Sequence, residues 1–317
     1  MHKLAVRTLA VACAVTTAAV LGACGSSGNG AAAGSGGGGP LAVVATTPEV
    51  ADFVRNIGGD HVTVTQIIKP NVDPHDYEPT PADIQAISTA AVVVKNGVGL
   101  EKWLDPTIQS AGFSGPVVDT SQGVTLHKGD PGNEEMAEGD PHIWHNPLNA
   151  KIMVTNIEKA FATADPADAA TYQANLATYS AKLDQLDKDN LAKFAKLPSA
   201  QRKLVTNHDA FGYYVDRYHL DFVGSVIPSM DTSAELSAQQ LTDLVAKIKA
   251  TGTKAIFTES SLPPKTAEAI ARQAGVKVVG GEDALYGDSL GALGTPQGTY
   301  LGAEQHNTDT IVAALGG

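Results

Sequence analysis

Cysteine is nearly absent from the sequence. The only two cysteines, Cys13 and Cys24, lie close to the N-terminus of the 317-residue chain. The rest of the chain therefore cannot form a disulfide, and its stability has to come from packing. With 43% hydrophobic residues, a chain of this length can bury the core of one large domain or of two lobes.

Basic residues are also scarce. Lys and Arg number 22 against 34 Asp and Glu, which gives a formal net charge of -12. No basic run follows the N-terminus, so we expect no nucleic-acid partner. The acidity is compatible with a cationic ligand, but many secreted proteins are acidic. The phosphate-binding pattern GxxxxGK[ST] is absent too, so any ATP-driven step requires a partner protein.

Residues 1–23 have the layout of a secretory signal peptide. Lys3 and Arg7 precede an apolar stretch that runs to Leu21 and ends in small residues. An uncleaved membrane anchor is the alternative, although the stretch is short for a spanning helix, which needs about 20 residues. The ending LGAC resembles the lipobox of bacterial lipoproteins, in which the cysteine, here Cys24, is lipidated and becomes the new N-terminus. We therefore expect an extracytoplasmic protein that is held at the cell membrane by a lipid.

Residues 24–40 comprise the lipidated cysteine, Cys24, and a segment rich in Gly and Ser. No side chain between residues 25 and 39 is larger and more apolar than alanine, so burial cannot offset the entropy of ordering the segment. This composition predicts a flexible tether, with the globular part beginning near Leu41.

The rest of the chain alternates short β-branched runs with helical patterns, in two blocks. In the N-terminal lobe, residues 41–165, we expect strands at 41–46, 62–68, 91–97 and 116–120 and helices at 48–59, 79–90 and 100–112. In the C-terminal lobe, residues 198–317, we expect strands at 203–207, 222–227, 254–260 and 276–280 with helices between them. The pattern predicts an α/β protein whose two lobes have mainly parallel sheets flanked by helices.

One long helical pattern, residues 166–197, separates the two blocks. Tyr172, Tyr179 and Leu183 belong to a single apolar stripe with helical spacing. A helix of about 30 residues is roughly 45 Å long and could link the two lobes. Two shorter helices with a break between Asp187 and Asn190 are the alternative.

Three histidines and one aspartate lie just past the ends of expected strands or at a helix start. They are His75, His142, His208 and Asp283. Ligands of open α/β sheets bind at this edge, and each lobe would supply two of the four residues. Three imidazoles and one carboxylate suit Zn²⁺, and four protein ligands would leave no open position for catalysis. Each residue also has a structural explanation, because Asp-Pro begins turns and His208 could cap a helix.

Four stretches carry a family resemblance that extends over residues 41–317. DPHDYEPTPADI, DPHIWHNP, TNHDAFGYY and the segment from FTESSLPPKT to GGEDALYGDSL resemble, in order, signatures of the zinc/manganese solute-binding proteins of bacterial ABC importers, cluster A-I. The resemblance implies two α/β lobes, one rigid connecting helix and a metal bound between the lobes. It implies His75, His142, His208 and Asp283 as ligands, with Glu259 as the alternative fourth ligand.

The resemblance also bears on the metal and on the neighbouring residues. Manganese members typically carry glutamate at the third position, where this chain has His208, as zinc members do. Many zinc members have a histidine-rich loop before the second ligand, whereas residues 127–140 here contain one histidine and several acids. We expect Asp73 and Asp140 to orient the imidazoles, and we expect His145 not to be a ligand.

These observations predict a lipid-anchored, monomeric receptor that captures Zn²⁺ and delivers it to a membrane permease driven by an ATPase. A Mn²⁺ or Fe²⁺ receptor is the nearest alternative. A zinc hydrolase with Glu259 as its base and an adhesin lipoprotein with a structural metal are more distant alternatives. If neutral histidines are the ligands, metal affinity should fall as the pH drops through about 6.5.

Overall fold

The computed structural model describes residues 39–128, 138–232, 234 and 236–316. Several predicted segments lie outside these residues, namely the signal peptide, Cys24, nearly all of the tether and the centre of the segment 127–140. Residues 39–317 form one compact unit. Within it, the predicted α/β class with two lobes and a long helix is confirmed. The lobe boundaries stay a prediction.

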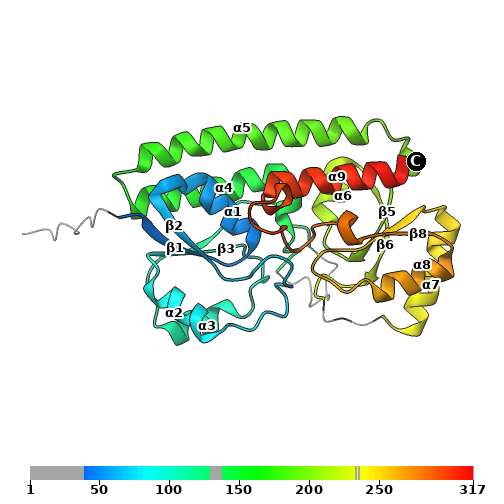
Figure 1. Cartoon of the computed structure of the whole chain (residues 1–317), viewed down its shortest axis with the longest axis horizontal. Helices are drawn as coiled ribbons and strands as arrows, with labels where there is room; N and C mark the ends of the chain where they lie inside the picture. The colour runs from blue at the N-terminus through cyan, green and yellow to red at the C-terminus, as the bar shows by residue number, and fades with distance from the viewer. Residues whose placement is uncertain (1–38, 129–137, 233, 235, 317) are drawn as a thin grey trace, which may run out of the picture. The chain divides into compact units, whose positions relative to one another are not determined.

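The N-terminal lobe contains a four-stranded parallel sheet. Its strands β1 (Leu41–Ala45), β2 (Val62–Gln66), β3 (Val92–Lys95) and β4 (Val117–Asp119) are arranged in the order β2-β1-β3-β4. Helices α1 (Pro48–Gly58) and α4 (Pro147–Ala164) cover one face, and α2 (Pro81–Thr89) and α3 (Leu104–Ala111) cover the other (Figure 1). The mainly apolar central strands β1 and β3 fit a sheet covered on both faces, whereas the edge strand β2 alternates valine with exposed threonine.

Local sequence signals explain where these helices begin. The Thr80 hydroxyl and the Asp83 carboxylate form a capping box at the start of α2, with Pro81 in its first turn. The Asn146 side chain accepts a hydrogen bond from the backbone N–H of Leu148 at the start of α4, where Pro147 follows the cap. In both caps, the side chain and the group that it contacts are at most three residues apart in the sequence.

The C-terminal lobe contains two short parallel ladders. One pairs β5 (Lys203–His208) with β6 (Asp221–Ile227), and the other pairs β7 (Ala255–Phe257) with β8 (Lys277–Val279). β7 lies beside β5. Helices α6 (Gly212–Tyr218), α7 (Ala238–Thr251) and α8 (Lys265–Ala274) pack around the strands. All eight expected strands are therefore present.

Helix α5 (Ala169–Phe194) is uninterrupted, so a break near Asp187 is wrong. Its predicted apolar stripe faces inward, and Tyr172 and Leu183 are fully buried. Figure 1 shows α5 running past both sheets, outside α4 and the last helix, α9 (Tyr300–Gly316). The sequence patterns above did not predict α9, which packs against α5 and α1.

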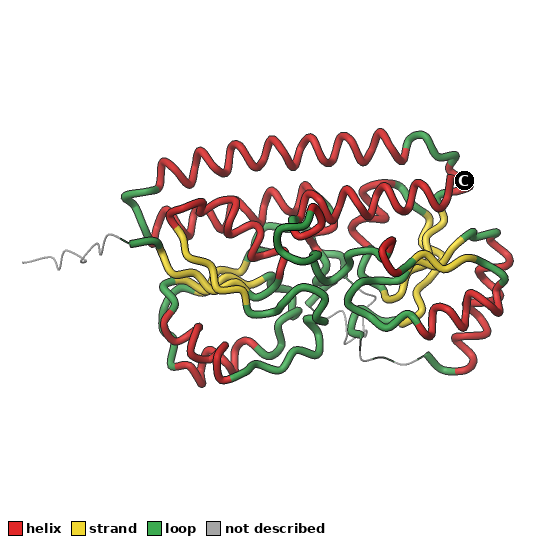
Figure 2. The backbone as a smooth tube through the Cα atoms, in the orientation of Figure 1, coloured by secondary structure: helices red, strands yellow, loops and turns green. Residues whose placement is uncertain are grey.

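The loops that follow the strands of the two lobes face each other (Figure 2). The backbone N–H of Asn71 donates to Ser289 Oγ at 2.6 Å, and Thr232 Oγ1 donates to Asp73 Oδ2 at 2.6 Å. On the helix side, Tyr300 N–H donates to Asp52 Oδ2 at 3.1 Å. The carboxyl ends of the parallel strands of both lobes, and the side chains that follow them, therefore lie in the region between the lobes.

Candidate metal site

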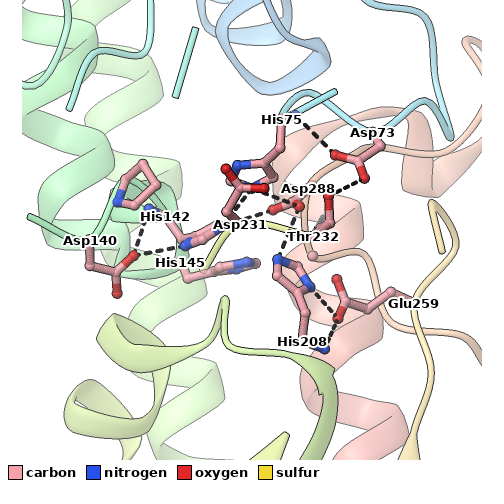
Figure 3. A network of polar contacts seen from close by, with 12 residues as sticks. Asp73, His75, Asp140, His142, His145, His208, Asp231, Thr232, Glu259 and Asp288 are labelled. Carbon is pink, nitrogen blue, oxygen red and sulfur yellow. Dashed lines mark hydrogen bonds and ion pairs between the residues drawn. The ribbon is translucent and has the colours of Figure 1, made fainter. Parts of the chain in front are cut away.

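Four buried side chains from both lobes converge between the strand ends. His75, His142, His208 and Asp288 each direct one nitrogen or oxygen toward the others, and these atoms all lie within 4.8 Å of one another (Figure 3). The carboxylate is central: its oxygens lie 3.1 Å from His208 Nε2 and 3.3 Å from both His75 Nε2 and His142 Nε2.

The two Asp-Pro-His stretches use the same local turn. Asp73 Oδ1 accepts a hydrogen bond from the backbone N–H of His75, and Asp140 Oδ1 accepts one from that of His142, both at 2.9 Å. An aspartate that bonds to the backbone two residues later folds the chain into a turn. Each stretch therefore presents its histidine in the same way, although the two loops come from different parts of the N-terminal lobe.

Two of the imidazoles are oriented by a carboxylate on the side away from the centre. His142 Nδ1 lies 2.8 Å from Asp140 Oδ1, and His208 Nδ1 lies 2.8 Å from Glu259 Oε1. With the proton of the neutral ring held at Nδ1, the Nε2 lone pair faces the other donors. Asp140 thus has its predicted orienting role, whereas Asp73 Oδ2 accepts from Thr232.

Glu259 is not among the four converging residues. Its Oε1 accepts the Nδ1 contact from His208 and the backbone N–H of the same residue at 3.2 Å. Of the two roles considered for Glu259 in the sequence, its position fits the supporting one. Its other oxygen, Oε2, is buried and has no hydrogen-bond partner in the described part of the chain.

The structure places Asp288, and not the predicted Asp283, beside the three histidines. Asp283 is exposed in the short 3-10 turn η5 (Gly281–Asp283) and stays apart from the histidines. After this turn the chain pairs again with the extension of β7: Leu285 N–H donates to Thr258 O at 2.8 Å, and Ser260 N–H donates to Leu285 O at 2.9 Å. The pairing with β7 therefore continues beyond Asp283, and Asp288 lies just past the end of this pairing.

Gly287 allows the chain to pass close to the supporting acid. A Cβ at this position would collide with the Glu259 carboxylate. The signal that could have identified the correct acid is thus the Gly-Asp pair of LYGDSL rather than the distance from β8.

Burial and neighbouring charges shift the pKa values of the residues in the site in opposite directions. The side chains of His142, His208 and Asp288 are 0% exposed and that of His75 is 5% exposed. Burial would raise the pKa of Asp288, but His208 and His142 hold that pKa well below its usual value. Burial lowers the pKa of His142, but Asp288 and Asp140 outweigh it and raise the pKa to about 9. Glu259 and Asp288 likewise outweigh burial and raise the pKa of His208 well above its usual value.

The inward-facing atoms fit a cation. Both oxygens of Asp288 and Nε2 of His208 are buried and make no hydrogen bond within the described residues. The polar contacts of these atoms are the ion pairs of 3.1 to 3.3 Å that join the carboxylate to the three imidazoles. Buried polar groups normally have hydrogen-bond partners, so inward-facing atoms without one indicate a ligand. A divalent metal coordinated by three imidazole nitrogens and a carboxylate oxygen would satisfy them.

His145 and Trp144, which follow His142, form the 3-10 turn η3 (Ile143–His145). His145 Nδ1 contacts Glu304 Oε1 at 2.7 Å, and His145 is not among the four converging residues. The Trp144 indole lies edge-on to His142, with ring centroids 5.5 Å apart.

Comparison with known proteins places the whole globular part in one family. Residues 43–314 match the family described as ZnuA, zinc-uptake complex component A, periplasmic. The manganese-binding lipoprotein MntA of Bacillus subtilis (strain 168) is 34% identical over 279 residues, which cover 87% of this chain and 90% of that protein. The zinc-binding protein TroA of Treponema pallidum (strain Nichols) is 35% identical over 277 residues, with 86% and 88% covered.

Further matches extend this similarity to another named metal and to a solved structure. The iron ABC transporter substrate-binding lipoprotein MtsA of Streptococcus pyogenes serotype M1 is 30% identical over 302 residues, which cover 93% of this chain and 94% of that protein. The solved structure of the periplasmic zinc-binding protein TroA from Treponema pallidum superposes with a TM-score of 0.79 at 34% identity, covering 88% of this chain and 99% of that chain. The names of these relatives include zinc, manganese and iron.

The two aspartates of the GEDALYGD segment provide a matched test of the site. Asp288→Ala removes the central carboxylate, and we expect it to weaken Zn²⁺ binding by at least about a hundredfold. Asp283→Ala removes an exposed acid five residues earlier and should leave binding within about twofold. Competition with a zinc chelator measures both. Equal losses in the two variants would contradict the placement of Asp288.

The raised histidine pKa values predict a pH dependence at higher pH than the sequence alone suggests. A proton has to leave His142, whose pKa is raised to about 9, and His208, whose pKa is also raised, before a metal can bind. Metal affinity should therefore already fall with decreasing pH above pH 6.5. If metal binding releases two protons, the affinity falls by about a hundredfold for each pH unit by which the pH is lowered. Zn²⁺ titrations between pH 6.5 and 8.5 measure how the affinity changes with pH. An affinity that is constant over this interval would contradict the ion pairs of protonated His142 and His208 with their carboxylates.

Proposed function

Because the chain belongs to the family of zinc-uptake complex component A, we propose that it captures Zn²⁺ outside the cytoplasm and delivers it to the permease of an ABC importer. The observation that carries this proposal is the set of four buried donors that converge from both lobes. Such a site encloses a single ion, and it can exchange that ion when the lobes move relative to each other.

The donor set favours Zn²⁺ among the metals named for the relatives. Zn²⁺ is most often bound by four ligands, and imidazole nitrogen is one of its preferred donors. Mn²⁺ prefers more oxygen donors in an octahedral arrangement. His208 supplies a nitrogen, and Oε1 of the Glu259 carboxylate beside it accepts from His208 Nδ1 and from the backbone N–H of His208. Mn²⁺ or Fe²⁺ remains the alternative cargo, because similar proteins are named for these metals.

Binding and release, rather than catalysis, fit the environment of the site. A catalytic zinc centre keeps a coordination position open for water and has a general base nearby. Here four protein donors would surround the ion, and Glu259, the candidate base of a hydrolase, is held against His208. We therefore propose a receptor without enzymatic activity.

The membrane and its transporter are the expected partners. In the described part of the chain, no helix has the length and apolar character needed to cross a membrane. Attachment through a lipid on Cys24, which precedes the described residues, would keep the receptor beside the permease, and a separate ATPase would supply the energy. We propose that the receptor acts as a monomer, because both halves of the site come from one chain.

The metal content of protein from its native host tests the choice of Zn²⁺. Purified without added metal, the wild type should carry about one Zn²⁺ per chain, and His208→Ala should carry much less. Native loading is more informative than affinity alone, because Zn²⁺ outcompetes Mn²⁺ at most such sites. Inductively coupled plasma mass spectrometry gives both values. A wild type loaded mainly with manganese or iron would overturn the assignment.

A further inference from the structure

The turn that carries His142 is fixed to the last helix by two buried polar contacts. Tyr300 OH donates to the carbonyl oxygen of Trp144 at 2.6 Å, and His145 Nδ1 lies 2.7 Å from Glu304 Oε1. Both partners in α9 are one helical turn apart, so they face η3 together. The helix therefore holds η3 at Trp144 and His145, the second and third residues after His142.

The same turn is also joined to the loop that carries Asp288. Trp144 Nε1 donates to the carbonyl oxygen of Gly287 at 3.2 Å. Gly287 directly precedes Asp288, and Trp144 is two residues from His142. Hydrogen bonds thus link α9 through η3 to the backbone carbonyl oxygen of Gly287, the residue before the central carboxylate of Asp288.

The burial of the His145–Glu304 pair points to positioning rather than to stability. The side chains are 0% and 3% exposed, and His145 Nε2 and Glu304 Oε2 have no hydrogen-bond partner in the described residues. A buried pair with unsatisfied atoms contributes little net stability compared with apolar side chains of similar size. It does fix geometry, because the His145 ring is also stacked on Phe211 with centroids 4.5 Å apart.

We propose that Glu304 and Tyr300 are positioning residues that fix the separation of His142 and Asp288 and thereby favour Zn²⁺ over Mn²⁺. A rigid set of four donors matches the tetrahedral preference of Zn²⁺. Mn²⁺ requires space for additional oxygen ligands. Loosening η3 should therefore weaken Zn²⁺ binding more than Mn²⁺ binding. This inference rests on the proposed function, because it assumes that the four donors hold the transported ion.

Three variants of α9 and one control test the inference. Glu304→Leu removes the acceptor of His145, Glu304→Gln keeps an oxygen acceptor at the same place, and Tyr300→Phe removes only the hydroxyl group. The control is Thr308→Val, one turn further along α9. The Thr308 hydroxyl is equally buried and bonds to Tyr214 of α6 instead of to η3. Thermal unfolding of the metal-free proteins reports any general loss of stability.

Chelator competition with Zn²⁺ and with Mn²⁺ gives the ratio of the two affinities, which tests the inference. Removing a group that supports a metal ligand typically costs 10- to 100-fold in affinity. We expect Glu304→Leu to lower the Zn²⁺:Mn²⁺ affinity ratio by about tenfold and Tyr300→Phe to lower it by a smaller factor. Glu304→Gln and Thr308→Val should keep the wild-type ratio, even where the unfolding temperature falls.

The outcomes separate this inference from the proposed function. If Glu304→Leu and Tyr300→Phe have the same ratio as Thr308→Val, the positioning role is wrong. It is also wrong if Glu304→Gln lowers the ratio as far as Glu304→Leu does. If the wild type binds neither metal, the proposed function fails, whatever the variants do.

Discussion

The Asp288 carboxylate, fully buried among three imidazoles, is the constraint on which the site depends. A charge in this position needs a cationic partner, because burial of an isolated carboxylate is costly. In the metal-free protein, Asp288 and a second carboxylate beside each ring outweigh burial and raise the pKa of His142 and His208, so that a proton on these rings can supply this partner. A divalent ion replaces two such protons without changing the net charge of the site. Binding and release can then proceed without leaving a buried charge uncompensated.

Supporting contacts turn this electrostatic requirement into a defined geometry. Asp140 and Glu259 hold one ring nitrogen of His142 and His208, so the other nitrogen faces the centre. The turn at Asp73 places His75, and the renewed pairing at Leu285 places Asp288. The donors therefore come from segments far apart in the sequence. His75 and His142 are fixed by an aspartate two residues earlier, whereas His208 and Asp288 are fixed by contacts with the extension of β7. Such a site needs little reorganisation to receive an ion, which is the usual contribution of supporting groups to metal binding.

Most of the fold could be predicted from local patterns. The β-branched runs identified the strands, and the apolar stripe from Tyr172 to Leu186 identified α5. Helix α9 could not be found in this way, because its buried face includes Glu304, Asn307 and Thr308 and lacks an apolar stripe. These polar residues are buried because they have partners in other elements, and a single sequence does not reveal tertiary partners.

The site was predicted in part for a similar reason. His75, His142 and His208 were identified because each histidine follows a strand or precedes a helix. Asp283 was chosen by its distance from β8, but the second pairing at Leu285 moves the edge of the ladder toward Asp288. A strand interrupted by the η5 turn and then resumed leaves no periodic pattern in the sequence. The tertiary contacts of Gly287 and Asp288 with Glu259 and the three histidines distinguish the two acids, and they are not visible in a single sequence.

X-ray absorption at the zinc edge of the zinc-loaded protein tests the central claim most directly, namely that these four side chains enclose one ion. The account predicts four nitrogen or oxygen neighbours at about 2.0 to 2.1 Å, three of them imidazoles. A shell of five or six neighbours, or one with fewer than three imidazoles, would contradict it.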